Sequence, residues 1–144
     1  MGKVRDILRN KGNSIFSIEP SETVFSALEL LVRNNIGALM VVEDRKFVGI
    51  FTERDYARKV ILKGKASKGT LVREIMSQQP ITVTTHTTIQ ECMSVMTTMY
   101  IRHLPVVDDG ELVGLISIGD VVKFIIDEQI GIIEYLEHYI TGHQ

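Results

Sequence analysis

The chain contains one seven-residue pattern twice: Gly-Ile-Phe-Thr-Glu-Arg-Asp at residues 49–55 and Gly-Leu-Ile-Ser-Ile-Gly-Asp at residues 114–120. Each copy has a glycine, two apolar residues, a hydroxyl residue and, three positions after the hydroxyl, an aspartate. A hydroxyl followed three residues later by an acid is typical of a helix N-terminus. Each copy therefore predicts the end of a strand and the beginning of a helix.

The two copies belong to a longer internal repeat. They are 65 residues apart (114 − 49), and the same offset pairs Thr23 with Thr88 and Val41-Val42 with Val106-Val107. An internal repeat of this kind indicates two similar structural units that bury their sheets together. The chain of 144 residues is accordingly divided into a leading helical segment (1–14), a first repeat (15–62), a linker (63–71), a second repeat with its own lead (72–126) and a C-terminal amphipathic helix (127–144).

Each repeat is predicted to run strand, helix, strand, strand, helix. The first strand is expected at 16–18 and again at 81–83. In the second repeat Thr88 and Glu91 have the spacing of a capping box. Asp109-Gly110 suits the type I′ turn of a hairpin. The predicted fold class is therefore α+β, with two pseudo-symmetric β-α-β-β-α units packed as one module and an extra C-terminal helix.

Composition narrows the possible functions. Sixteen Lys and Arg against eighteen Asp and Glu give a net charge of −2, which argues against nucleic acid as a partner. The apolar stretches are too short to span a bilayer, and no apolar signal segment begins the chain. The single Cys92 excludes a disulfide framework. We expect a cytoplasmic protein without membrane, nucleic acid or metal partners.

The two aspartates allow two interpretations. In the first, Thr52 and Ser117 only cap helices, and Asp55 and Asp120 only favour the positive end of the helix dipole. In the second, the same geometry presents N–H groups to a phosphate and a carboxylate to the two hydroxyls of a ribose.

Taken together, these motifs resemble a pair of CBS domains, also called a Bateman module. The resemblance rests on the tandem repeat, the similar leads Val-Arg-Asp-Ile-Leu (4–8) and Val-Arg-Glu-Ile-Met (72–76), the stretch Arg-His-Leu-Pro-Val-Val (102–107) and the doubled motif. It covers roughly residues 3–126 and resembles a stand-alone CBS-domain protein. It implies two clefts between the repeats, an adenosine-containing ligand, and association into a homodimer.

The resemblance implies a residue set for each cleft. In the first, Asp55 would hold the ribose, basic side chains would face phosphate, and Ile50 and Ile81 would sandwich the purine. In the second, Asp120 and Ser117 would face residues of the first repeat. The members of the first cleft are Ile50, Thr52, Arg54, Asp55, Ile81, Arg102, His103 and Pro105, and those of the second are Phe16, Gly37, Ala38, Met40, Leu115, Ser117 and Asp120.

The clefts are not equivalent in charge. Gly119 stands where the first motif has Arg54, and Gly37-Ala38 stand where the second repeat has Arg102-His103. The first cleft is therefore expected to bind a phosphorylated ligand more tightly. AMP or NAD is favoured and ATP is allowed, while no catalytic cofactor is expected.

The predicted function is regulatory: nucleotide binding senses energy or redox state and is passed on, as a conformational shift, to an unidentified target protein. Two alternatives remain, a ligand-independent dimerisation scaffold and a small nucleotide-processing enzyme with Cys92 and His103 as nucleophile and base. No catalytic residue is predicted, because Cys92 aligns with Ala27 on an apolar helix face. The tail helix either packs on its own domain or forms a dimer contact.

Overall fold

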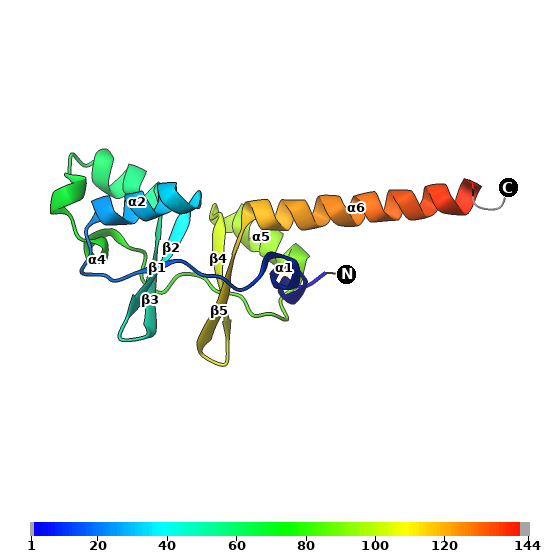
Figure 1. Cartoon of the computed structure of the whole chain (residues 1–144), viewed down its shortest axis with the longest axis horizontal. Coiled ribbons are helices and arrows are strands. Elements are labelled where there is room, and N and C mark those ends of the chain that lie inside the picture. Colours follow the sequence, from blue (N-terminus) through cyan, green and yellow to red (C-terminus); the bar gives the residue numbers. More distant parts are fainter. Residues whose placement is uncertain (1, 142–144) are drawn as a thin grey trace. The chain divides into compact units, whose positions relative to one another are not determined.

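The computed structural model describes residues 2–141, and the chain divides into two compact units (Figure 1). One unit comprises residues 14–81; the other combines residues 2–13 with residues from 82 onward. Each has its own apolar core, centred on Phe51 and Leu39 in the first and on Leu104 and Ile116 in the second. The α+β class predicted from the sequence is confirmed.

The unit of residues 14–81 is a three-stranded sheet with helices. Strand β1 is parallel to β2, and β2 is antiparallel to β3. Its elements are β1 (Ser17–Ile18), α2 (Val24–Asn34), β2 (Ala38–Glu43), β3 (Lys46–Thr52), α3 (Glu53–Tyr56), the π-helix η1 (Ala57–Ile61), the 3-10 helix η2 (Ser67–Gly69) and α4 (Val72–Ile75).

In the described part of the other unit, the sheet has two strands. Its elements are α1 (Val4–Lys11), α5 (Ile89–Met99), β4 (His103–Asp108), β5 (Glu111–Ser117) and α6 (Ile118–Thr141). The strand predicted at 81–83 is reduced to one parallel bridge between Val83 and Val106. In the first unit the Met40 N–H donates to the Phe16 carbonyl. The equivalent residue here is Pro105, which has no N–H, so the ladder cannot extend to Ile81.

Both hairpins turn through residues with positive φ. Asp109 and Gly110 have φ of 50° and 79°, and Asp44 and Arg45 have φ of 51° and 66°. Two successive residues in this region are required by the type I′ turn, which matches strand twist. The predicted hairpin is confirmed in both repeats, and Arg45 adopts a conformation that glycine adopts more readily.

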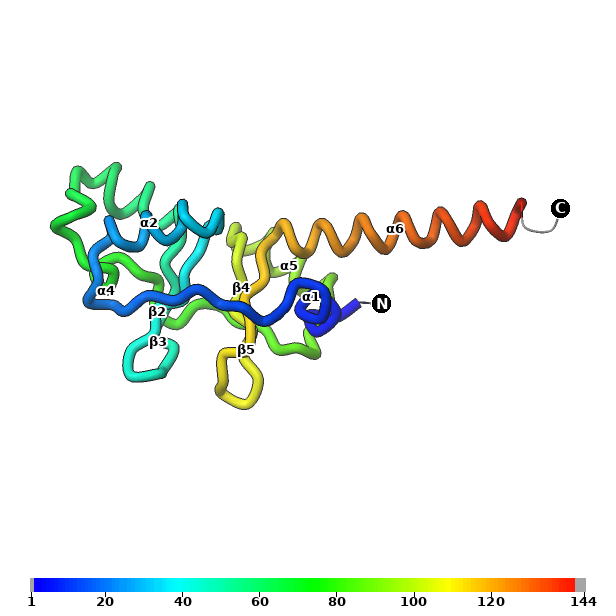
Figure 2. Tube along the Cα trace, viewed as in Figure 1, coloured from blue at the N-terminus to red at the C-terminus, as the bar shows by residue number. Residues whose placement is uncertain are grey.

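The two lead helices are exchanged between the units. Helix α4, expected to lead the second repeat, packs in the unit of the first, while α1 packs in the unit of the second (Figure 2). Lys3 forms a bridge with Thr88, and Leu71 forms the same bridge with Thr23. The linker brings the chain back to the start of α2, where the Val24 N–H donates to the Thr70 carbonyl at 2.8 Å. The predicted boundary at residue 72 thus separates repeats in sequence but not in packing.

Helix α6 joins two segments that were expected to be separate. It begins after Ser117 and continues through residue 126, the predicted end of the second repeat, to Thr141. Gly131 does not interrupt it, although glycine costs about 1 kcal/mol relative to alanine in a helix. Val121 is buried, but residues 126–141 are all exposed; residues 142–144 of the predicted tail helix lie outside the described part.

None of the helices within residues 2–141 combines the length and apolar content that a membrane crossing requires.

Candidate functional site

Each repeated motif forms a helix cap, as the sequence predicts. At the junction of β3 and α3, the Asp55 N–H donates to Thr52 Oγ1 at 3.1 Å, and the Thr52 N–H donates to Asp55 Oδ2 at 3.0 Å. At the junction of β5 and α6, the Asp120 N–H donates to Ser117 Oγ at 3.1 Å, and the Ser117 N–H donates to Asp120 Oδ2 at 2.8 Å. The cap orients each carboxylate toward the end of its strand.

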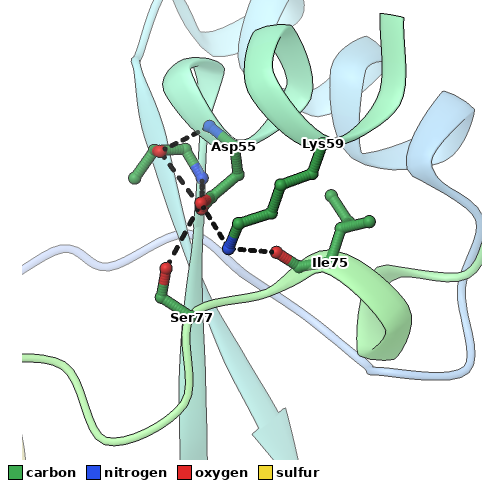
Figure 3. A network of polar contacts seen from close by, with 5 residues as sticks. Asp55, Lys59, Ile75 and Ser77 are labelled. Atoms are coloured by element: carbon green, nitrogen blue, oxygen red, sulfur yellow. Dashed lines mark hydrogen bonds and ion pairs between the residues drawn. The ribbon is translucent and has the colours of Figure 1, made fainter. Parts of the chain in front are cut away.

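The carboxylate of Asp55 has further partners inside its unit (Figure 3). Asp55 is only 7% exposed, and its Oδ1 lies 3.2 Å from the Ser77 hydroxyl, which donates to it, and 3.1 Å from Lys59 Nζ. Lys59 also donates to the Ile75 carbonyl at 3.1 Å. A sugar hydroxyl that reached Oδ1 would therefore have to replace the contact with Ser77 or with Lys59.

Asp120 has a comparable lysine partner from a different element. Lys11 Nζ, at the end of α1, lies 2.7 Å from Asp120 Oδ2 and donates to the Leu115 carbonyl at 2.7 Å. In both units a lysine thus connects the aspartate of the motif with the exchanged lead helix of that unit. The two lysines are unrelated by the repeat, since the position equivalent to Lys59 is Phe124.

Sequence reasoning missed both lysines. Lys59 could have been found, because Asp55 and Lys59 have the i,i+4 spacing of a helical ion pair. Lys11 carries no such signal, because its contact with Asp120 spans 109 residues of chain.

The surroundings of Asp120 and His103 shift both pKa values downward. Burial alone would raise the pKa of Asp120, but hydrogen bonds from Lys11 and Ser117 together with the Lys11 charge outweigh it and hold the pKa below its usual value. The pKa of His103 is lowered mainly by burial and next by the positive charge of Lys11; Arg102 adds to this and Asp120 opposes it. The Asp120 carboxylate is therefore charged, and His103 neutral, at pH 7.

The Lys11–Asp120 pair predicts a pH-dependent stability difference. A carboxyl whose pKa is depressed by folding contributes stability above its unfolded pKa and loses it as pH falls through the folded value. Lys11→Ala should lower the free energy of unfolding by about 0.5 kcal/mol at neutral pH, since solvent screens this partly exposed pair. The difference should shrink as the pH falls below 3.8, the ordinary pKa of the carboxyl, and disappear in acid below the depressed folded pKa, where the carboxyl is protonated.

Urea unfolding of both proteins at neutral pH and in acid measures this difference. Arg5→Ala is the matched control, because it removes a positive charge from an exposed residue of the same helix. A loss for Lys11→Ala that persisted unchanged in acid would contradict the ion-pair explanation.

Each unit carries some residues of each predicted cleft, but Ile81, which was predicted to lie across the first cleft from Ile50, belongs with Ile50 to the unit of residues 14–81. Ala38 and Met40, assigned to the second cleft, pair directly with Thr52 and Ile50, which were assigned to the first. Phe16 and Gly37 join them through backbone bonds to Met40 and Glu53. In the other unit, the first-cleft residues His103 and Pro105 pair with Ser117 and Leu115 of the second cleft, and the Ile118 N–H donates to the Arg102 carbonyl. That the residues of the two units come together to form the two clefts stays a prediction.

Exposure separates the predicted apolar contacts into two groups. Ala38, Met40 and Ile50 are at most 5% exposed, so their side chains belong to the core. Phe16 and Ile81 are 42% and 38% exposed. These two side chains are the most exposed of the predicted apolar contacts, while Leu115 is half-buried and Pro105 is buried.

A cavity of about 600 Å³ opens elsewhere, between β1, α2 and the turn that joins β2 to β3. None of the predicted site residues lines it. Four carboxylates and two guanidinium groups do, and an excess of carboxylates disfavours an anionic phosphate. The charged side chains are Glu19, Glu22, Glu29, Asp44, Arg33 and Arg45.

The alternative nucleophile has the wrong surroundings. Cys92 is fully buried, and burial together with the charge of Glu91 raises the pKa of its thiol to about 11. A thiol is an effective nucleophile only as thiolate.

Among residues 2–141, His, Cys, Asp and Glu side chains nowhere gather in a group of three that could hold a metal.

Comparison with known proteins identifies both repeats. The family model for the CBS domain matches residues 4–62 and again residues 72–127. In sequence, these ranges agree with the predicted repeats and their leads.

The relatives include proteins of similar size. The mitochondrial CBS domain-containing protein CBSX3 of Arabidopsis thaliana is 38% identical over 96% of this chain and 72% of its own length. The structure of a candidate signal-transduction protein with CBS domains from Burkholderia ambifaria MC40-6 is 45% identical, with a TM-score of 0.85 over 88% of this chain and 96% of that one. A hexameric CBS-CP12 protein from bloom-forming cyanobacteria is 26% identical, with a TM-score of 0.74 over 83% of this chain and 70% of that one.

Proposed function

Since this chain belongs to the CBS domain family, we propose that it is a non-catalytic regulatory module that binds an adenosine nucleotide. Binding would take place in clefts to which both repeats contribute, and AMP or NAD is favoured over ATP. A ligand that prefers one arrangement of the repeats shifts the equilibrium toward it by its differential affinity. Energy or redox state would be sensed in this way and passed to a target protein.

One observation carries the proposal: both units hold an aspartate at a helix N-terminus in an ion pair with a lysine. Asp55 with Lys59, and Asp120 with Lys11, place an acceptor for ribose hydroxyls beside a cation that can turn to a phosphate. A structural cap needs only the hydroxyl and the backbone. The lysines supply the charge that a nucleotide requires and a cap does not.

We propose that the first cleft binds the phosphorylated ligand more tightly. Arg54, Arg102 and His103 would face the phosphate there, whereas the second motif has Gly119 and its opposite strand Gly37-Ala38. The second cleft would be weaker or would accept adenosine without phosphate. Isothermal titration with two equal sites per chain would contradict this asymmetry.

Thermal unfolding with a nucleotide panel tests the proposal. A ligand that binds only the folded state at about a hundred times its Kd adds about 2.7 kcal/mol of stability, which raises the Tm of a chain this long by roughly 5–10 °C. AMP, NAD or ATP should give such a shift, and GMP at the same concentration should not. Mass analysis of the recovered ligand separates a sensor, which returns it unchanged, from an enzyme. If no adenosine nucleotide shifts the Tm, the proposal falls and the scaffold function stands.

A pH dependence is expected if His103 faces the phosphate. Because burial and Lys11 hold its pKa below the usual value, an added phosphate raises that pKa and binding takes up a proton. From about pH 8 to about pH 6, the affinity for AMP should rise by up to about tenfold more in the wild type than in His103→Gln. The variant corrects for titration of the phosphate itself. Equal pH profiles would remove His103 from the site.

We further propose that the module works as a homodimer in the cytoplasm. The cyanobacterial CBS-CP12 protein is hexameric, so self-association is known for this fold. The Arabidopsis relative is mitochondrial, which makes cell fractionation the direct test of the location.

A further inference from the structure

The exposed part of α6 carries a regular strip of six residues, of which all but Gln129 are apolar. Its residues are spaced alternately four and three apart, which is the repeat that keeps one helix in contact with another along a coiled coil. The strip continues well past the part of α6 that packs on its own unit, which ends near Ile125. Its members are Val122, Ile126, Gln129, Ile133, Leu136 and Ile140.

The apolar members of the strip are available for contact. Ile126, Ile133 and Leu136 are 51–53% exposed, and Ile140 is 70% exposed. Ile130, Ile132 and Tyr139 flank the strip and are 48–61% exposed. One or two such side chains would be ordinary on a protein surface, but a continuous strip of this length marks an interaction site.

We propose that this strip pairs with the same strip of a second copy of the chain, with the two helices antiparallel. The inference deepens the homodimer proposed above by assigning it a surface, and it does not depend on nucleotide binding. In this register Val122 faces Ile140 of the second copy, Ile126 faces Leu136, and Gln129 faces Ile133. Gly131 is at the centre of the pairing, on the outer side of both helices.

Charge complementarity favours the antiparallel direction. Lys123 is the only Lys or Arg of α6, and the acids that follow are Asp127, Glu128, Glu134 and Glu137. Lys123 and Glu137 each directly follow a residue of the strip, so they occupy the same position of the helical repeat. In an antiparallel pair this position faces the same position of the second copy. Lys123 of each copy therefore lies next to Glu137 of the other. In a parallel pair Glu137 would instead lie beside Ile132. The other three acids point away from the strip in both arrangements.

The area of the strip suits a second helix of the same length. With roughly 80 Å² of exposed area on each of its apolar and flanking side chains, pairing buries on the order of 600 Å² per copy. The total of about 1,200 Å² reaches the lower end of the range for specific interfaces. The acidic outer face disfavours an anionic lipid surface, which attracts helices with basic polar faces.

Sedimentation of the full-length chain over a range of concentrations tests the pairing. Ile133→Glu places a carboxylate in the strip and should weaken self-association by at least roughly tenfold. Tyr135→Glu is the matched control, since it adds the same charge to the same turn but off the strip, and it should associate like the wild type. Circular dichroism checks that both variants keep their helix content.

Cysteine cross-linking tests the direction. The double variant Ile126→Cys/Leu136→Cys should form disulfide-linked dimers under mild oxidation, while Ile126→Cys alone should not, because antiparallel copies hold their residues 126 far apart. Efficient cross-linking of Ile126→Cys alone would overturn the antiparallel arrangement.

The outcomes separate this inference from the proposals above. If Ile133→Glu and Tyr135→Glu associate equally, the homodimer stands but uses another surface, and the role of α6 is overturned. If the wild type remains monomeric at every concentration, the homodimer and the α6 pairing both fall, and the strip belongs to a partner of different sequence. Neither result changes the Tm shifts that test nucleotide binding.

Discussion

Gly49→Ala should lower the free energy of unfolding by about 2–3 kcal/mol, whereas Gly114→Ala should cost at most about 1 kcal/mol. The two glycines are equivalent in the repeat, but their neighbours differ. A Cβ on Gly49 would lie 2.8 Å from the carbonyl oxygen of Ser77, and a Cβ on Gly114 would lie 2.8 Å from the end of the Leu8 side chain. A side chain can rotate away, whereas the Ser77 carbonyl is fixed because it accepts from the Ile50 N–H at 3.0 Å.

Urea unfolding of the two variants provides the comparison, and each is the control for the other. The substitution is identical, and each residue is the glycine that begins its motif within β3 or β5, so the intrinsic preference of the strand for alanine cancels. Equal losses would show that the Ser77 carbonyl moves as easily as a leucine side chain, and would contradict a rigid contact between β3 and the segment after α4.

Asp55→Ala should have the second large effect, on both binding and stability. Removing charge-assisted hydrogen bonds to a ribose costs about 1.5–3 kcal/mol, which is roughly a ten- to hundredfold loss of nucleotide affinity. Folding should also lose about 2–3 kcal/mol, because the Ser77 hydroxyl and Lys59 lose a buried acceptor. Asp120→Ala should reduce affinity less, since the second cleft is expected to be weaker.

Calorimetry and urea unfolding measure the two effects, and Ser77→Ala separates them. This variant removes an internal hydrogen bond to Asp55 Oδ1 but keeps the carboxylate and Lys59, so it should lose stability while the ribose-binding group remains. Asp55→Ala and Ser77→Ala with the same small loss of affinity would indicate that the aspartate acts only as a helix cap. Unchanged binding in Asp55→Ala and in Asp120→Ala would indicate the same.

The features predicted correctly from the sequence are local ones. The hairpin turns, the cap formed by Thr52 and the cap formed by Thr88 each depend on residues within a few positions of one another. The repeat itself can be read from a constant offset. A proline at residue 105 was also visible, and its missing N–H would have argued against a full strand at 81–83.

The features that were missed depend on contacts between distant segments. The sequence of α1 or α4 does not indicate which unit the helix packs in, because both leads have the composition of an ordinary short helix. The pairing of Lys11 with Asp120 depends on the exchange of α1 and α4 and could not be foreseen without it. The pairing of cleft residues on neighbouring strands, such as Met40 with Ile50, could be foreseen because it follows from the hairpins, while the clefts themselves stay a prediction.

The exchange of lead helices has a consequence for synthesis on the ribosome. Residues 14–81 form one unit from a continuous stretch of chain, so this unit can complete itself while translation continues. Helix α1 is synthesised before this unit, yet its contacts, such as those with Thr85 and Thr87, are made with residues at least 80 positions later. The α1 segment therefore has no partner until residues from 82 onward have been synthesised, so its apolar face waits uncovered while the unit of residues 14–81 folds.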